Sequence, residues 1–274
     1  MILTPIRRYG AMSRMLLTLV FSSEVLAKTH TTTASQKSHL TKASNKQVSS
    51  KQEYSRNSAK SSSLPDLRKY PSGTPRKKAF LRTVMPYITS QNAAITAERN
   101  WLISKQYQGQ WSPAERARLK DIAKRYKVKW SGNTRKIPWN TLLERVDIIP
   151  TSMVATMAAA ESGWGTSKLA RNNNNLFGMK CMKGRCTNAP GKVKGYSQFS
   201  SVKESVSAYV TNLNTHPAYS SFRKSRAQLR KADQEVTATA MIHKLKGYST
   251  KGKSYNNYLF AMYQDNQRLI AAHM

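Results

Sequence analysis

The sequence predicts a mainly α-helical domain with one small β element, preceded by a disordered basic segment. After residue 78, apolar residues recur at helical spacing and no succession of alternating strands occurs. A Gly- and Lys-rich region from Cys181 to Phe199 is suited to a β-hairpin. Residues 28–77 are mostly Ser, Thr, Lys, Gln and Asn, and such a segment cannot bury a core.

The charge of the chain limits the class of partner. In 274 residues, 46 Lys and Arg stand against 13 Asp and Glu, which gives a net charge of +33. Such a field attracts anionic partners, either nucleic acid or a cell wall that carries carboxylates. Residues 28–77 fit either a basic tether to that wall or a solvated linker.

The N-terminus indicates export. Arg7 and Arg8 precede a short apolar run at residues 15–21, and Val25-Leu26-Ala27 is a small-residue cleavage pattern. We therefore interpret residues 1–27 as a signal peptide and expect an exported, periplasmic protein. The apolar run is too short to span a membrane, and no later segment is long enough. Export argues against a nucleic-acid partner.

The cysteine count favours a disulfide over a metal site. Cys181 and Cys186 are the only cysteines, and the five histidines are scattered without ligand spacing. A structural metal site needs four ligands, so we expect no metal and no other cofactor. In an exported protein the two cysteines are better interpreted as a disulfide across a tight turn at Lys183-Gly184.

Several helices are expected before residue 150. Apolar residues between Phe80 and Ile88 have helical spacing, and a further helix is expected around residues 97–103. The stretch S-P-A-E at residues 112–115 is a capping box with proline at the first helical position. Residues 139–146 are also expected to be helical.

The next expected helix carries Glu161. After Pro150, residues Met153, Met157 and Glu161 fall four apart, which places the glutamate on the buried stripe of a helix. Gly163 is suited to a left-handed cap, so Glu161 lies in the last turn. The helix dipole and the apolar neighbours both disfavour its charged form there, and a general acid needs such a raised pKa. The alternative is a structural glutamate paired to a lysine or arginine.

Three motifs in order resemble a known family. They are E-S-G-W-G-T-S-K-L-A from Glu161, N-N-L-F-G-M-K from Asn174, and Y-S-Q-F-S-S-V-K-E-S-V from Tyr196. This pattern, between Leu143 and Asp265, resembles the bacterial peptidoglycan β-N-acetylglucosaminidase family, which includes the muramidase domain of the flagellar rod protein and belongs to the lysozyme superfamily. The resemblance implies a lysozyme-like catalytic domain over residues 78–274.

The resemblance also implies an activity and site residues. It implies hydrolysis of the β-1,4 bond after N-acetylglucosamine in peptidoglycan glycan strands, with Glu161 as the catalytic acid. The substrate-binding candidates are Ser162, Trp164, Asn174, Asn175, Phe177 and Glu204. For the Asn174–Phe177 turn, packing of the hairpin is the alternative to substrate contact.

A second catalytic carboxylate is missing from the expected place. Glycoside hydrolysis usually takes two carboxylates, and many relatives keep the second in the hairpin. The corresponding C-T-N-A-P-G-K-V-K-G-Y contains no acid. Glu204 belongs to a second capping box, S-V-K-E. Asp233 and Glu235 lie at an expected helix start, and Asp265 lies in the last helix.

Tyrosines are therefore candidates for the second role. G-Y-S-T-K-G-K-S-Y-N-N-Y resembles the family's Y-A-T-D-x-x-Y segment, with Tyr248 and Tyr255 at the tyrosine positions. A phenol can hold a water or orient the substrate's acetamide as a nucleophile. Core packing is the alternative, and it is preferred for Tyr258 and Tyr263.

The predicted function is thus a peptidoglycan glucosaminidase. The alternatives are a wall-binding protein without turnover, a lytic transglycosylase that needs one acid, and a nucleic-acid-binding protein. The sequence indicates neither protein partners nor endo or exo action.

Overall fold

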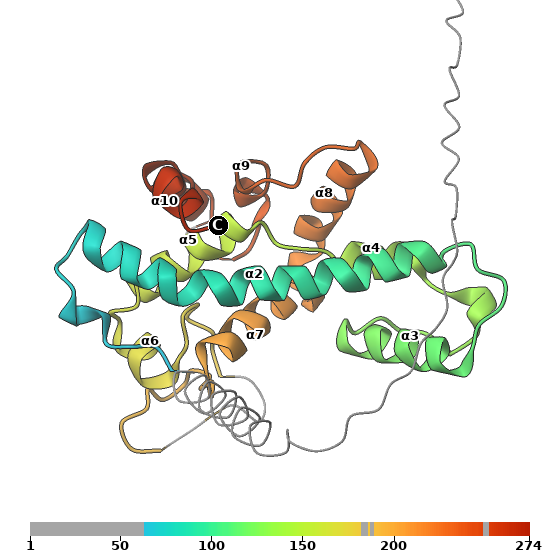
Figure 1. The fold of residues 1–274 in the computed structure, drawn as a ribbon, viewed down its shortest axis with the longest axis horizontal. Helices are drawn as coiled ribbons and strands as arrows, with labels where there is room; N and C mark the ends of the chain where they lie inside the picture. The colour runs from blue at the N-terminus through green and yellow to red at the C-terminus, as the bar shows by residue number, and fades with distance from the viewer. Residues whose placement is uncertain (1–62, 182–185, 187–188, 249–251) are drawn as a thin grey trace, which may run out of the picture. The chain divides into compact units, whose positions relative to one another are not determined.

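A computed structural model describes residues 63–181, 186, 189–248 and 252–274. The predicted signal peptide and the predicted linker as far as residue 62 lie outside these residues. The mainly helical fold is confirmed (Figure 1). The helices are η1 (Leu67–Lys69), α2 (Thr74–Lys105), α3 (Pro113–Arg125), η2 (Thr134–Lys136), α4 (Trp139–Arg145), α5 (Thr151–Ser162), α6 (Lys168–Asn173), α7 (Val202–Thr215), η3 (Pro217–Tyr219), α8 (Ser220–Lys231), α9 (Ala238–Met241), η4 (Ile242–Lys244) and α10 (Lys253–Ala271). None of these helices combines the length and the apolar character needed to cross a lipid bilayer.

Folded structure begins before residue 78, where we expected it to begin. Leu64 and Leu67 are buried in the core, and the backbone N–H of Leu64 donates to Asn174 Oδ1 at 3.1 Å. Residues 63–77 therefore belong to the folded part and not to the linker. Two leucines in a polar stretch form no periodic pattern, so this anchoring depends on long-range contacts that the local sequence does not reveal.

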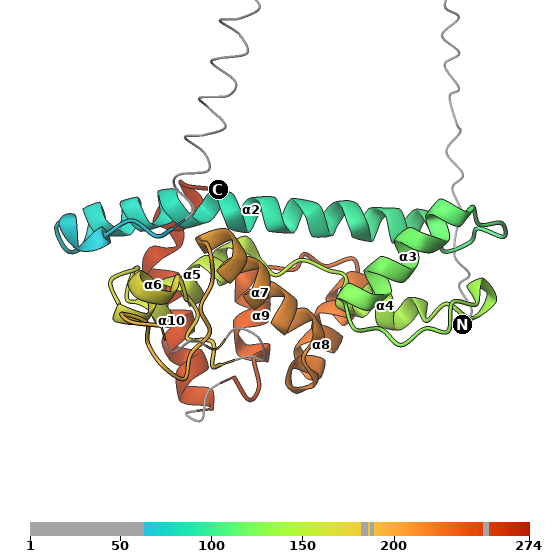
Figure 2. The same cartoon turned by 90° about the horizontal axis from the view of Figure 1, so that it is seen from below.

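Helix α2 replaces the two helices that we expected between residues 80 and 103. It runs for 32 residues, about 48 Å at the usual rise, and contains Pro86 in its interior. Asn92 lies where we expected a break, and its side-chain amide donates to Ile149 O at 2.8 Å and to Thr151 Oγ1 at 3.0 Å. The amide NH₂ group of this polar residue is thus satisfied at a packed interface, and the helix continues. Figure 2 shows α2 lying along one side of the other helices.

The local signals for α3, α4 and α5 are confirmed. Ser112 and Glu115 make both hydrogen bonds of the capping box, and α4 covers Trp139–Arg145. Helix α5 begins directly after Pro150 and ends at Gly163, whose φ is +57°. Residues Met153–Ala159 of α5 are buried, and the helix packs against α2 and α10 (Figure 1). This central helix positions Glu161.

The predicted hairpin lobe is not found. Among the described residues from Lys180 to Phe199, only isolated antiparallel bridges occur, Lys180 with Tyr196 and Cys186 with Ser197. The region has three glycines and a proline but few β-branched residues, so little favours a continuous ladder.

A buried charge network fixes the entrance to α5. Asp147 is 1% exposed, and its carboxylate lies 3.0 Å from Arg230 Nη2, 3.5 Å from Arg99 Nη1 and 3.7 Å from Arg226 Nε. Arg226 also donates to the carbonyl of Ile148 at 2.8 Å. Desolvation lowers the pKa of Arg226 to about 10, which leaves it charged at neutral pH. The network joins α2 and α8 to the segment before α5.

Candidate active site

Glu161 lies at the last turn of α5 and opens into a cavity. It is half-buried, whereas residues 153–159 of the helix are buried. Burial raises the pKa of its carboxyl above the ordinary value, and a hydrogen bond from Tyr255 opposes this shift. Both burial and the raised pKa agree with the properties expected of a general acid.

Two neighbours fix the Glu161 carboxyl. The hydroxyl of Tyr255, on α10, donates to Oε1. Gly178 has a φ of +62°, and a Cβ atom there would lie 3.3 Å from Oε2. Any larger residue at 178 would crowd the carboxyl and strain the backbone. The glycine of the N-N-L-F-G motif thus makes room for Glu161.

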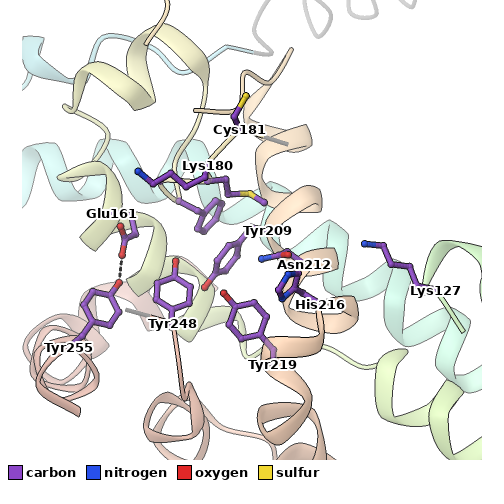
Figure 3. Close-up of a pocket in the computed structure, with 13 residues that line it drawn as sticks. Lys127, Glu161, Lys180, Cys181, Tyr209, Asn212, His216, Tyr219, Tyr248 and Tyr255 are labelled. Carbon is purple, nitrogen blue, oxygen red and sulfur yellow. Dashed lines mark hydrogen bonds between the residues drawn. The ribbon is translucent and has the colours of Figure 1, made fainter. Parts of the chain in front are cut away.

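The cavity has a volume of roughly 610 Å³ and is formed by five parts of the chain. Its lining residues are Lys127, Glu161, Phe177, Gly178, Met179, Lys180, Cys181, Tyr209, Asn212, His216, Tyr219, Tyr248 and Tyr255. In Figure 3, Glu161 and Tyr255 lie at one side, Tyr248, Tyr209 and Tyr219 follow, and Lys127 lies at the opposite side.

Aromatic rings form much of the wall. Phe177 stacks on Tyr209 with centroids 3.9 Å apart, and Tyr248 stacks on Tyr255 at 5.5 Å. Tyr248 also contacts Tyr209 edge-on at 6.4 Å and Tyr219 at 6.2 Å. Phenol rings offer sugar rings an apolar face and a polar edge, which suits a carbohydrate ligand.

The phenols remain protonated at neutral pH. Burial raises the pKa of Tyr248 and of Tyr255 well above the usual range, and burial also raises the pKa of Tyr209. Tyr209 is 1% exposed, and its hydroxyl has no hydrogen-bond partner among the described residues. A buried hydroxyl left in this way can hydrogen-bond a ligand that enters the cavity.

Of the predicted substrate-binding residues, only Phe177 lines the cavity. Ser162 is fully buried, donates to Ala158 O at 2.6 Å and accepts from Gly165 N–H at 2.8 Å. Trp164 packs edge-on against Phe80 with centroids 5.6 Å apart. Ser162 and Trp164 therefore stabilise the turn after α5, away from the cavity.

The other three candidates also bind the protein itself. Asn174 donates to Phe199 O at 3.1 Å, and Asn175 donates to Ser197 O at 3.0 Å. Both asparagines are buried. The two asparagines fix the turn that carries Phe177.

The carboxylate of Glu204 accepts from Ser200 N–H at 2.7 Å, while Glu204 N–H donates to Ser201 Oγ at 3.1 Å. Ser201 thus caps α7, and Glu204 binds Ser200 before the helix instead of the Ser201 N–H that the predicted capping box requires.

Cys181 and Cys186 are joined in a disulfide, with Cα atoms 5.2 Å apart. Cys181 lines the cavity, so the bridge lies beside the candidate site.

Within the part of the chain that the structure describes, no three His, Cys, Asp or Glu side chains gather into a metal site.

Glu161 is the one carboxylate among the lining residues that the structure describes. Asp233 and Glu235 do not line the cavity, and they do not begin a helix as we expected. Asp233 has a φ of +51° in the turn after α8, and α9 is capped by Thr237 instead. Asp265 is exposed on α10.

Sequence reasoning missed several lining residues. Tyr209 and Asn212 lie three apart on one face of α7, and His216 is the residue that caps the end of this helix. This spacing is visible in the sequence, but a tyrosine among apolar residues of a helix does not by itself indicate a cavity. Tyr219 lies in η3 after the end of α7, and Lys127 follows the end of α3. No sequence pattern at these positions indicates a cavity.

Comparison with known proteins identifies a near-identical relative and a matching family model. The chain is 99% identical over 274 residues to "Protein bax" of Escherichia coli (strain K12), and the match covers 100% of both chains. The family model described as "Glucosaminidase: Mannosyl-glycoprotein endo-beta-N-acetylglucosaminidase" matches residues 138–268, which include Glu161 and most of the cavity. No solved structure matches the chain.

Proposed function

The chain belongs to the family of Protein bax and carries a glucosaminidase domain, and from this premise we propose that it is a peptidoglycan hydrolase. The proposed reaction is hydrolysis of the β-1,4 bond after N-acetylglucosamine, with Glu161 as general acid. One observation carries this proposal. A half-buried carboxyl with a raised pKa opens into a cavity walled by neutral phenols.

In the proposed reaction, protonated Glu161 gives its proton to the glycosidic oxygen while the bond from that oxygen to the sugar C1 breaks. Burial favours the protonated carboxyl before the reaction. The positive charge that develops at C1 is then met by a nucleophile, and the proton of an incoming water returns to the Glu161 carboxylate.

The second catalytic role goes to a group other than a carboxylate. The hydroxyl of Tyr255 donates a hydrogen bond to the Glu161 carboxyl, so we assign Tyr255 as a positioning residue for the acid. Tyr248 lies next to it in the wall, and we assign its hydroxyl the role of orienting either a water or the acetamide of the substrate. If the acetamide oxygen attacks C1 first, water opens the resulting ring in a second step.

The test is digestion of purified peptidoglycan by wild-type protein and by Glu161→Gln. Gln keeps the shape of the side chain and removes the transferable proton, so we expect turnover to fall on the order of a hundred- to ten-thousand-fold. Glu204→Gln is the matched control, because Gln keeps a side-chain oxygen that can accept from Ser200 N–H. Full activity of folded Glu161→Gln would exclude the assignment.

The products distinguish the other functions. A hydrolase releases reducing ends, whereas a lytic transglycosylase releases anhydro products that are lighter by one water. A wall-binding protein without turnover would sediment with peptidoglycan and release neither.

We also propose that the protein is exported to the periplasm after removal of residues 1–27. The positive residues, the apolar run and the small-residue pattern at the N-terminus support this. A mature N-terminus at Lys28 in a periplasmic fraction is the expected result, and an intact Met1 in the cytoplasm would contradict it.

A further inference from the structure

Lys127 lines the cavity at the side opposite Glu161 (Figure 3). It follows the last turn of α3 and has a φ of +54°. Its N–H donates to Lys124 O at 3.1 Å, and the N–H of Val128 donates to Ala123 O at 2.8 Å. These bonds close a helix C-terminus at which glycine is the usual residue, because only glycine adopts the left-handed conformation without strain.

The conformation of Lys127 is held in place from α4. Arg145 Nη1 donates to Tyr126 O at 3.0 Å and to Lys127 O at 2.8 Å. These contacts use only the backbone of residue 127, so they do not require a lysine side chain. A strained residue held in this way is a candidate for a role of its side chain.

The side chain of Lys127 is exposed, and its ammonium forms no ion pair with any described acidic residue. Lys180, the other lysine of the lining, is engaged with Tyr196, with its Nζ 3.1 Å from the hydroxyl and 4.4 Å from the ring centre. The side of the cavity at Lys127 therefore presents a positive charge that no carboxylate of the described residues neutralises there.

We propose that Lys127 binds a carboxylate of the substrate and thereby favours muramic-acid-containing strands over neutral chitin chains. This inference rests on the proposed function, because it assigns a ligand group to the same cavity. Two carboxylates of peptidoglycan have the required chemistry, the lactyl group of muramic acid and those of the attached peptide. The aromatic wall between Glu161 and Lys127 would contact the sugar rings between the scissile bond and that carboxylate.

The experiment measures binding in the Glu161→Gln background by titration calorimetry. The ligands are chitotetraose, which is neutral, the peptide-free tetrasaccharide of alternating N-acetylglucosamine and muramic acid, and the same tetrasaccharide with its peptides. We expect the muramic-acid ligands to bind tighter than chitotetraose, and Lys127→Gly to weaken only those two, by about tenfold. Lys127→Gln should also weaken the binding of only the two muramic-acid ligands. Lys127→Arg keeps the positive charge and should therefore retain the preference for them.

Lys129→Gln is the matched control, since Lys129 is an exposed lysine two residues away that does not line the cavity. Lys127→Gly should unfold at a temperature no lower than the wild type, because glycine relieves the backbone strain at this position. Loss of preference without loss of stability would separate a ligand-binding role from a structural one.

Each outcome bears on the proposal. A preference seen with the peptide-free ligand assigns the lactyl carboxylate, and one that needs the peptides assigns theirs. Equal binding of all three ligands, or an equal effect of Lys127→Gly on chitotetraose, would overturn the inference. Failure of the wild type to cleave peptidoglycan would refute the proposed hydrolase while leaving this binding preference measurable.

Discussion

Replacing Tyr255 by Phe removes the one described hydrogen bond to the Glu161 carboxyl and keeps the aromatic ring. The hydroxyl donates, so it stabilises the charged form of the acid and opposes the effect of burial on the pKa. In Tyr255→Phe the pKa of Glu161 should therefore rise further. Because a general acid must be protonated, the alkaline limb of the pH–rate profile should move to higher pH.

The size of this shift follows from the kind of bond. A hydrogen bond to a charged group contributes about 1.5–3 kcal/mol, and about 1.4 kcal/mol corresponds to a factor of ten. Proton binding by Glu161 should therefore strengthen by roughly 10- to 150-fold in the variant. The free energy of unfolding should also change, and the difference between variant and wild type should grow as pH rises and Glu161 loses its proton.

The assay is release of reducing ends from purified peptidoglycan between acid and alkaline pH, with each profile normalised to its maximum. Tyr258→Phe is the matched control, because Tyr258 lies on the same helix, is 54% exposed and makes no hydrogen bond to Glu161. If turnover falls equally at every pH and the limb stays in place, Tyr255 acts on the nucleophile and does not position the acid. Movement of the limb to lower pH would refute the reasoning altogether.

Three further predictions concern stability. Because burial raises the pKa of Glu161, the stability that its protonated form contributes is lost as pH rises through that pKa. The melting temperature of Glu161→Gln should therefore lie above that of the wild type at neutral pH, and the two melting temperatures should coincide in acid. Gly165→Ala should cost about 1–3 kcal/mol in urea unfolding, because its Cβ would lie 2.6 Å from Leu67 Cδ1 at a φ of +78°; an unchanged midpoint would contradict this. Asp147→Asn should cost about 3–5 kcal/mol, because it leaves the fully buried Arg226 without a counter-charge, and a loss below 1 kcal/mol would show that backbone carbonyls suffice.

The parts of the fold that the sequence predicted are those with local signals. The capping box at Ser112 and the left-handed glycine at 163 act within a few residues of themselves, so α3 and the end of α5 were predictable. The position of Glu161 follows from the same local pattern. By contrast, the continuity of α2 past Asn92 depends on hydrogen bonds to residues near 150, which no local pattern contains.

The cavity was less predictable, because it forms only when distant helices meet. Tyr209 and Tyr248 are 39 positions apart in the sequence, yet their rings are in contact. Polar residues of the family-like motifs have contacts within the protein that the sequence did not indicate. Ser162 and Asn175 were interpreted as substrate contacts, but backbone groups of the turns beside the site occupy their hydrogen-bonding atoms.

The electrostatics of the cavity favour catalysis over binding alone. A binding site for a glycan needs neither a carboxyl at the C-terminal end of a helix nor the burial that disfavours its charge. Among the described lining residues Glu161 is the one carboxylate, and the phenols hold their protons. When a sugar displaces water from such a wall, the charged form of Glu161 becomes still less favourable. In the proposed mechanism the proton is then retained until the glycosidic oxygen accepts it.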